Sequence, residues 1–238
     1  MIYVLIGLFM FMWSLFIYHV VLDKRLEGFF AKGFTSFMFI VIFIYGVYSF
    51  LTKRQETFYV LLFEYKYVYL ILFTLLGLVS GLIGDLFLEV QWFYKKRKHF
   101  MISQGMMIFL IGHLFYILAM ILFSGFHYSA LLVGSAMVII VYIGSKLLDI
   151  DFKRLKIMTY IYTFVIFAMV GLSFYQAIHQ GFSLYSIVFL IGALSFGISD
   201  LFLAPIYFKD EMKHFFVVGN LFTYYLGQFL IALAILFI

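Results

Sequence analysis

The sequence predicts an all-α integral membrane protein, a bundle of eight transmembrane helices. Of its 238 residues, 66% are hydrophobic and only 11% are charged, whereas about 25% of the residues in a soluble domain are charged. The apolar residues also gather in stretches of about 20, which is the length that a helix needs to cross the hydrocarbon core of a bilayer. The chain is too apolar for a soluble fold, and its apolar stretches fit a membrane.

The apolar stretches follow one another along the whole chain, so we expect residues 1–238 to form a single transmembrane domain. No connecting segment is long enough for a soluble domain. The first stretch has neither a positively charged start nor a small-residue cleavage motif, which predicts a retained helix, not a signal peptide. The only proline, Pro205, directly follows the seventh stretch, where it would end a helix. The predicted helices are 2–21, 34–51, 68–90, 100–123, 128–148, 157–178, 182–204 and 215–238.

The basic residues predict the orientation of the helices. Most of the 16 Lys and Arg residues lie in the first, third, fifth and seventh loops. Loops rich in Lys and Arg face the cytoplasm, so both termini are expected on the extracytoplasmic side of the cell membrane. The second loop contains only Lys53, Arg54 and Lys66. The basic residues of the odd-numbered loops are Lys24, Arg25, Lys32, Lys95, Lys96, Arg97, Lys98, Lys146, Lys153, Arg154, Lys156, Lys209 and Lys213.

The two halves of the chain contain an internal repeat. A shift of 115 residues aligns helices 3–4 with helices 7–8 without a gap. Because the two copies are four helices apart, they insert in the same direction, which predicts a parallel repeat. Membrane sites commonly lie where such repeats meet. The identical pairs include Gly77/Gly192, Ser80/Ser195, Asp85/Asp200, Leu86/Leu201, Phe87/Phe202, Leu88/Leu203, Lys98/Lys213, His99/His214 and Gly112/Gly227.

Asp85 and Asp200 are the leading candidates for functional residues. Each is a carboxylate inside an apolar segment, and each is followed by Leu-Phe-Leu. A charged side chain near the centre of a bilayer costs about 2.5–3.5 kcal/mol on insertion scales. Because the chain carries this cost twice, in matched surroundings, we expect the two carboxylates to be used.

Further polar residues of the apolar segments are candidates for substrate-binding or supporting roles. His113 and Gln228 occupy matching positions of the repeat, and each can hydrogen-bond a carboxylate or a ligand. Lys32 could contact a phosphate head group or extend its ammonium group to the membrane surface. The remaining candidates are Thr35, Tyr116, Ser199, Asn220, Tyr224 and Tyr225.

Several other classes of site are disfavoured. The chain has no Cys, which excludes thiolate metal sites, and it has no HExxH motif. A divalent cation held by Asp85, Glu89, Asp200 and His113 is the less favoured alternative, and we expect no metal and no cofactor. The net charge of +5 could suggest nucleic acid, but the orientation of the helices already accounts for it.

Several short motifs of the chain occur together in a known family. They are Gly84-Asp85, Gly105-x6-Gly112-His113-x2-Tyr116, Ser199-Asp200, Tyr224-Tyr225-Leu226-Gly227-Gln228 and Lys32-Gly33-Phe34-Thr35. In this combination the chain resembles the lysoplasmalogenase family of membrane proteins, also called the YhhN family. The similarity spans most of the chain, and Gly33 stands where the family usually has Pro.

This resemblance implies an eight-helix enzyme that cleaves the vinyl ether bond of lysoplasmalogens. The products would be a fatty aldehyde and glycerophosphoethanolamine or glycerophosphocholine, and the substrate would be a lysophospholipid in the bilayer. The family's two aspartates map onto Asp85 and Asp200, which suit acid–base chemistry, although the sequence does not identify the acid. The alternatives are a proton-coupled carrier of small solutes, because membrane Asp and His residues also occur in transporters, and a lipid-binding protein without turnover.

Overall fold

The computed structural model describes residues 1–53, 65–208 and 214–238. Within these ranges, eight helices are long and apolar enough to cross a membrane. The prediction of an all-helical membrane protein is therefore confirmed. The parallel repeat and the side on which the termini lie stay predictions. Arg54, Lys209 and Lys213 lie outside the described residues.

The chain forms two compact units, residues 1–119 with 235–238 (unit 1) and residues 120–234 (unit 2). Unit 1 contains α1 (Ile2–Val21), α2 (Arg25–Lys53), α4 (Tyr65–Val90), η1 (Lys95–Arg97), α5 (Lys98–Ser124) as far as residue 119, and η3 (Ile235–Phe237). Unit 2 contains the end of α5, then α6 (Ser129–Leu147), η2 (Lys153–Leu155), α7 (Lys156–His179), α8 (Leu184–Phe208) and α9 (His214–Ala234).

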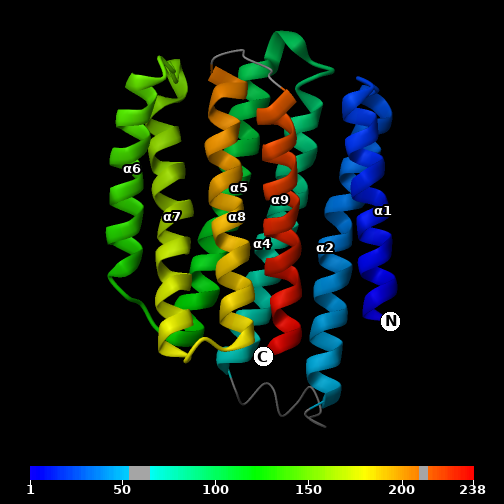
Figure 1. Cartoon of the computed structure of the whole chain (residues 1–238), viewed down its shortest axis with the longest axis vertical. Helices are drawn as coiled ribbons and strands as arrows, with labels where there is room; N and C mark the ends of the chain where they lie inside the picture. The colour runs from blue at the N-terminus through cyan, green and yellow to red at the C-terminus, as the bar shows by residue number, and fades with distance from the viewer. Residues whose placement is uncertain (54–64, 209–213) are drawn as a thin grey trace. The chain divides into compact units, whose positions relative to one another are not determined.

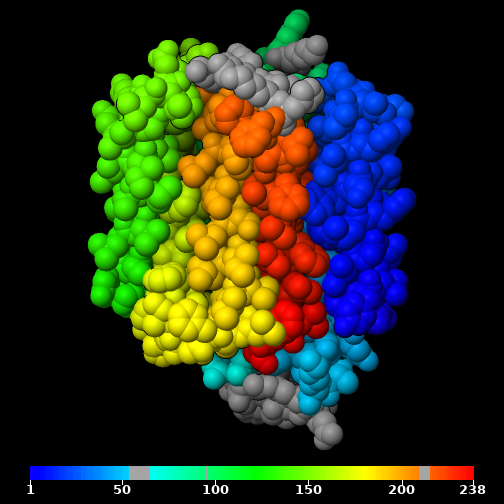
Figure 2. Space-filling model, viewed as in Figure 1, coloured from blue at the N-terminus to red at the C-terminus, as the bar shows by residue number. Residues whose placement is uncertain are grey.

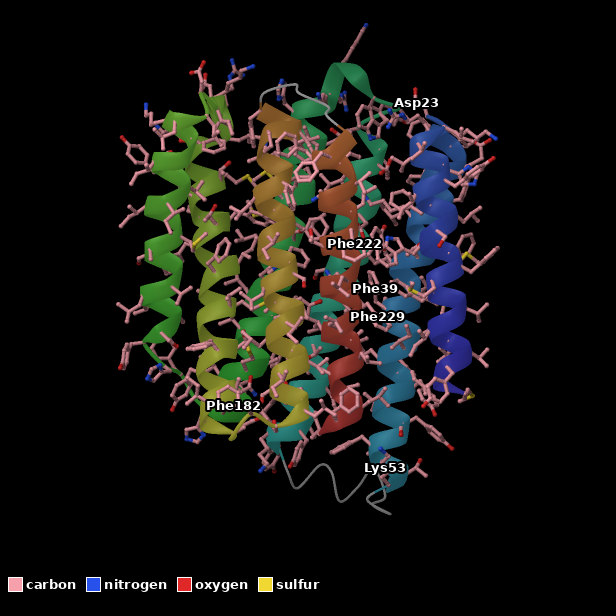
Figure 3. The ribbon with its side chains drawn as sticks, viewed as in Figure 1. Asp23, Phe39, Lys53, Phe182, Phe222 and Phe229 are labelled. Carbon is pink, nitrogen blue, oxygen red and sulfur yellow. The ribbon has the colours of Figure 1, made fainter. Side chains whose placement is uncertain are left out.

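Aromatic side chains hold α1 against α2 in unit 1, where the two helices run side by side (Figure 1). The ring of Phe9 lies 5.7 Å from that of Trp13 and 5.5 Å from that of Phe39. Figure 3 labels Phe39 on α2 and Asp23 at the turn between the helices. All three rings are buried, and such pairs stabilise packing by about 0.5–1.5 kcal/mol beyond the area that they bury.

Small residues bring α8 and α9 together in unit 2, and the space-filling view shows the two helices in contact along their length (Figure 2). A Cβ atom at Gly227 would lie 2.9 Å from the carbonyl oxygen of Gly192. In unit 1, a Cβ atom at Gly112 would lie 3.2 Å from the carbonyl oxygen of Gly77. Glycine at these positions allows close contact between backbones, as in other membrane helices.

The predicted start of the second helix is wrong. The second helix was expected to begin at residue 34, but α2 begins at Arg25. The sequence was misleading because Arg25, Glu27 and Lys32 interrupt the apolar run. In the structure, the guanidinium group of Arg25 pairs with Asp23 and lies 3.9 Å from the ring centre of Trp92. The polar first turns belong to α2, so Lys32 lies well inside the helix.

The seventh predicted helix also ends too early. We expected it to stop at residue 204, before Pro205, but α8 continues to Phe208. A proline lacks one backbone N–H, and helices in a membrane tolerate this loss where neighbouring groups compensate for it. Because Pro205 lies in the last turn, it interrupts few hydrogen bonds.

Candidate active site: two acidic residues in the membrane-spanning helices

Asp85 of α4 lies beside Lys32 and Ser36 of α2, all within unit 1. The Ser36 hydroxyl donates a 2.6 Å hydrogen bond to Asp85 Oδ2, and Lys32 Nζ lies 3.5 Å from Asp85 Oδ1. Lys32 and Ser36 are four residues apart, so both project from the same face of α2. Asp85 is only 1% exposed and Lys32 only 7%. Each oxygen of this buried carboxylate therefore has a polar partner.

Lys32 contacts a second acid as well. Its Nζ lies 3.3 Å from Glu89 Oε1, and Glu89 follows Asp85 by one turn of α4. The ammonium group also lies 5.9 Å from the ring centre of Phe16. Buried charges persist in proteins when they are paired. Lys32 is thus a shared partner of the two carboxylates of this site, whereas the sequence left open whether it contacts a phosphate head group or extends to the membrane surface.

Three further candidates lie in unit 1. The hydroxyl of Thr35 donates a 2.7 Å hydrogen bond to the Ala31 carbonyl, inside its own helix. His113 Nδ1 lies 2.7 Å from the Phe109 carbonyl oxygen, and because a carbonyl only accepts, this nitrogen carries a proton. The rings of His113 and Tyr116 are 6.0 Å apart and perpendicular. Both are buried to 1% exposure, so they form part of the apolar interior of the unit.

Asp200 of α8 has different surroundings, within unit 2. It accepts a hydrogen bond from the hydroxyl of Tyr162 on α7. Its other oxygen, Oδ2, is buried and has no hydrogen-bond partner among the described residues. Asp200 forms no ion pair with any residue that the structure describes. Among the described residues, the partner that the structure gives this carboxyl group is therefore a neutral hydroxyl.

The remaining candidates lie on α8, the helix that carries Asp200, and on α9. The Ser199 hydroxyl donates a 2.8 Å hydrogen bond to the Phe196 carbonyl, and the side-chain amide of Asn220 donates a 2.9 Å hydrogen bond to the Ser199 carbonyl. Asn220 therefore ties α9 to α8 one residue before Asp200. Tyr224, Tyr225 and Gln228 are buried in the same unit, and the Tyr224 ring lies 5.3 Å from the Phe196 ring and 5.0 Å from the Tyr225 ring.

Sequence reasoning missed two partners of the acids, Ser36 and Tyr162. Ser36 could have been found, because it follows Lys32 by four residues and must share its face of the helix. Tyr162 gave no such signal, since it is one of 19 Tyr residues in the chain and no nearby residue marks it. Contacts between separate helices, not local patterns, make these two residues partners of the acids.

No cluster of three or more His, Cys, Asp or Glu side chains suited to a metal ion occurs in the ranges that the structure covers. Asp85 and Glu89 share the ammonium group of Lys32 as a partner, so a cationic side chain already faces both carboxylates. The chemistry that this arrangement offers is acid–base chemistry by carboxyl groups.

Comparison with known proteins identifies one family. The model described as the YhhN family matches residues 57–235. This range includes both acidic residues, His113 and all of the α8 and α9 candidates, whereas Lys32, Thr35 and Ser36 precede it. No curated protein and no solved structure matched the chain.

Proposed function

The chain belongs to the YhhN family, and from this premise we propose that it is a membrane-embedded hydrolase of lysoplasmalogens. It would cleave the vinyl ether bond and release a fatty aldehyde together with glycerophosphoethanolamine or glycerophosphocholine. The lysophospholipid would reach the enzyme from the bilayer. The observation that carries the proposal is that each unit contains one of the two matched aspartates within a helix long and apolar enough to cross a membrane, and that these two aspartates have different partners.

Hydrolysis of a vinyl ether requires both an acid and a base. Protonation of the double-bond carbon away from the ether oxygen gives an oxocarbenium ion. Water then adds to the positively charged carbon and loses a proton to a base. The resulting hemiacetal breaks its bond to the ether oxygen, which takes up a proton and leaves as the alcohol. Glycosidases use two carboxyl groups for a related reaction through an oxocarbenium-like transition state.

We assign the acid to Asp200 and the base to Asp85. An ionised carboxylate without a partner is costly in apolar surroundings, whereas the neutral acid is not. Asp200 has a hydroxyl partner and no ion pair with a described residue, which favours the neutral, proton-donating form. Asp85 has an ammonium group at 3.5 Å, which favours the ionised form that stabilises a cation and accepts a proton from water. Exchange with water would restore both forms after each turnover.

The other candidates would support these two groups. Lys32 and Ser36 would hold the charge and the orientation of Asp85, because both contact its carboxylate. Asn220 would fix the backbone next to Asp200 through the Ser199 carbonyl. His113, Tyr116, Tyr224, Tyr225 and Gln228 would have substrate-binding or supporting roles, with Thr35 as a helix-stabilising residue.

Aldehyde release from a lysoplasmalogen by the purified protein tests the proposal. We expect Asp85→Asn and Asp200→Asn each to reduce kcat by roughly 10²–10⁴-fold, the usual contribution of one acid or base. If the two residues act as a unit, the double variant is about as slow as the slower single variant.

Glu89→Gln is the matched control, because it changes an acid of the same helix to its amide without removing either proposed catalytic group. An Asp200→Asn variant that folds and keeps full turnover would refute the assignment. Solute uptake into vesicles without aldehyde would instead support the carrier, and lipid binding without product would support the non-catalytic alternative.

We also propose that the odd-numbered loops face the cytoplasm. Because the chain has no Cys, single cysteines can report the side of each loop. An impermeant maleimide should label Phe126→Cys, between α5 and α6, in intact cells. It should label Arg154→Cys, between α6 and α7, only after the membrane is opened, and the reverse pattern would invert the topology.

A further inference from the structure

A polar pocket lies where α6 ends and α7 begins, entirely within unit 2. Its volume is about 170 Å³. Lys146 comes from the last turn of α6 and Lys156 is the first residue of α7, while Asp149 and Asp151 lie in the connection between them. Phe152 and Tyr160 provide an apolar wall, with ring centres 5.9 Å apart. The pocket thus presents two positive and two negative groups beside two aromatic rings.

Hydrogen bonds order the connection that carries the two aspartates. After α6, the chain turns back so that the Ile150 N–H donates a 2.8 Å hydrogen bond to the Ser145 carbonyl. Asp149 occupies the left-handed region of backbone conformation, with φ of 53°. Asp151 Oδ1 accepts a 2.9 Å hydrogen bond from the backbone N–H of Lys153. The buried ring of Phe152 lies 5.0 Å from that of Phe208 on α8, which anchors the connection to the rest of the unit.

The charged side chains of the pocket do not form ion pairs with one another. Neither Lys146 nor Lys156 forms an ion pair with any residue in the described ranges, and the same holds for Asp149 and Asp151. All four are exposed at the edge of the pocket. They are therefore available to a ligand that carries both signs of charge.

We propose that this pocket binds a zwitterion made of a phosphate group and a primary amine, the head group of an ethanolamine phospholipid. The two lysines would bind the phosphate, since Lys is a common phosphate ligand, and the two aspartates would bind the ammonium group. A ligand with only negative charge meets two carboxylates, and a ligand with only positive charge meets two ammonium groups. A ligand with both charges avoids either repulsion.

The size and place of the pocket agree with a head group. Pockets for whole drug-sized ligands measure about 300–1,000 Å³, so a volume of about 170 Å³ suits a fragment and not a complete lipid. The two lysines lie at the ends of helices long and apolar enough to cross a membrane, which is the level of the lipid head groups. Binding here is independent of the proposed hydrolysis, so either proposal can fail without the other.

Titration of the delipidated, full-length protein with dioleoyl phosphatidylethanolamine, followed by native mass spectrometry, tests this site. We expect the double variant K146Q/K156Q to bind this lipid at least about tenfold more weakly, because it loses two charge-assisted contacts. The matched control is K153Q/R154Q, which removes two positive charges from the same connection but none from the pocket. It should bind within about twofold of the unchanged protein. All four side chains are exposed, so both variants should fold.

The aspartates provide a second test, of selectivity. The unchanged protein should prefer phosphatidylethanolamine to phosphatidylglycerol, and D149N/D151N should lose this preference. Competition by free phosphoethanolamine distinguishes the two sources of the head group. If free phosphoethanolamine binds and the intact lipid does not, the pocket recognises the proposed zwitterion, and its ligand is the soluble compound. Equal losses of lipid binding in K146Q/K156Q and K153Q/R154Q would overturn the proposal, because they indicate only diffuse attraction by a basic surface. Equal binding of both lipids by the unchanged protein would overturn it for the same reason.

Discussion

The two acidic residues of the membrane-spanning helices share the same local sequence but not the same environment. Asp85 in unit 1 has an ammonium group and a hydroxyl as partners, whereas Asp200 in unit 2 has a tyrosine hydroxyl and one buried oxygen without a described partner. The second acid is also particular to unit 1, because Glu89 aligns with Ala204 in the repeat. Within the described ranges, the cation and the additional acid thus occur together beside Asp85 and not beside Asp200.

The difference shows that the identity of a residue and its neighbours in sequence do not determine its chemistry. Helix α2 contributes a lysine to one carboxylate and α7 contributes a tyrosine to the other. Two similar local sequences therefore give one aspartate that faces a cation and one whose described partner is a neutral hydroxyl. A reaction that needs a proton acceptor and a proton donor can use such a pair without any difference in residue type.

The largest effect should come from removing the cation of unit 1. We expect Lys32→Met to destabilise the protein by about 3–5 kcal/mol, the usual consequence of leaving a buried charge without its partner. Unfolding in detergent, followed by circular dichroism, measures the change. Lys24→Met is the control, because Lys24 is exposed at the turn between α1 and α2. Adding Asp85→Asn and Glu89→Gln to Lys32→Met should recover stability, and a Lys32→Met variant as stable as its control would contradict the charge-balance argument.

The two hydroxyl partners offer a sharper comparison. Ser36→Ala removes a hydrogen bond to a charged carboxylate, which is worth about 1.5–3 kcal/mol, whereas Tyr162→Phe removes one to a neutral acid, worth about 0.5–1.5 kcal/mol. Ser36→Ala should therefore shift the unfolding midpoint further. Double-variant cycles with Asp85→Asn and Asp200→Asn would isolate each contact. A larger effect at Tyr162 would indicate that Asp200 is the ionised member of the pair.

Helix packing can be compared at the matched glycines. In Gly227→Ala, the new Cβ atom would lie 2.9 Å from the Gly192 carbonyl oxygen, and in Gly112→Ala it would lie 3.2 Å from the Gly77 carbonyl oxygen. Overpacking of this kind costs about 1–3 kcal/mol, and we expect the greater loss at Gly227, where backbone atoms are closer. Thermal unfolding of the two variants measures the difference. Gly144→Ala is the control, since no atom lies within 4 Å of its added Cβ, and equal losses at all three glycines would mean that close contact is not the cause.

The smallest change should follow from amide substitution in unit 2. If Asp200 is neutral, Asp200→Asn replaces a group with one of nearly equal shape and charge, and stability should fall by less than about 1.5 kcal/mol. Asp85→Asn removes the carboxylate that faces Lys32, so it should destabilise the protein more. Chemical unfolding of both variants under identical conditions tests this order, and the opposite order would exchange the acid and the base.

Features that depend on residues close together in the chain could be predicted from the sequence, whereas contacts between distant segments could not. The apolar stretches predicted eight helices because a bilayer of fixed thickness requires about 20 apolar residues for each crossing. Charged residues caused the main error, since Arg25, Glu27 and Lys32 hid the first turns of α2. The acids themselves were predicted, because a carboxylate in an apolar stretch is visible without a structure.

The amino-acid sequence by itself determined that this is a helical membrane protein with Asp85 and Asp200 in its spans, because hydropathy and burial cost depend on residue type and segment length. Only the tertiary structure decided which groups face each carboxylate. Ser36 and Asp85 are 49 residues apart in the chain, and Tyr162 and Asp200 lie on different helices. Their contacts depend on how α2 packs on α4 and how α7 packs on α8, and no local pattern of the sequence encodes that packing.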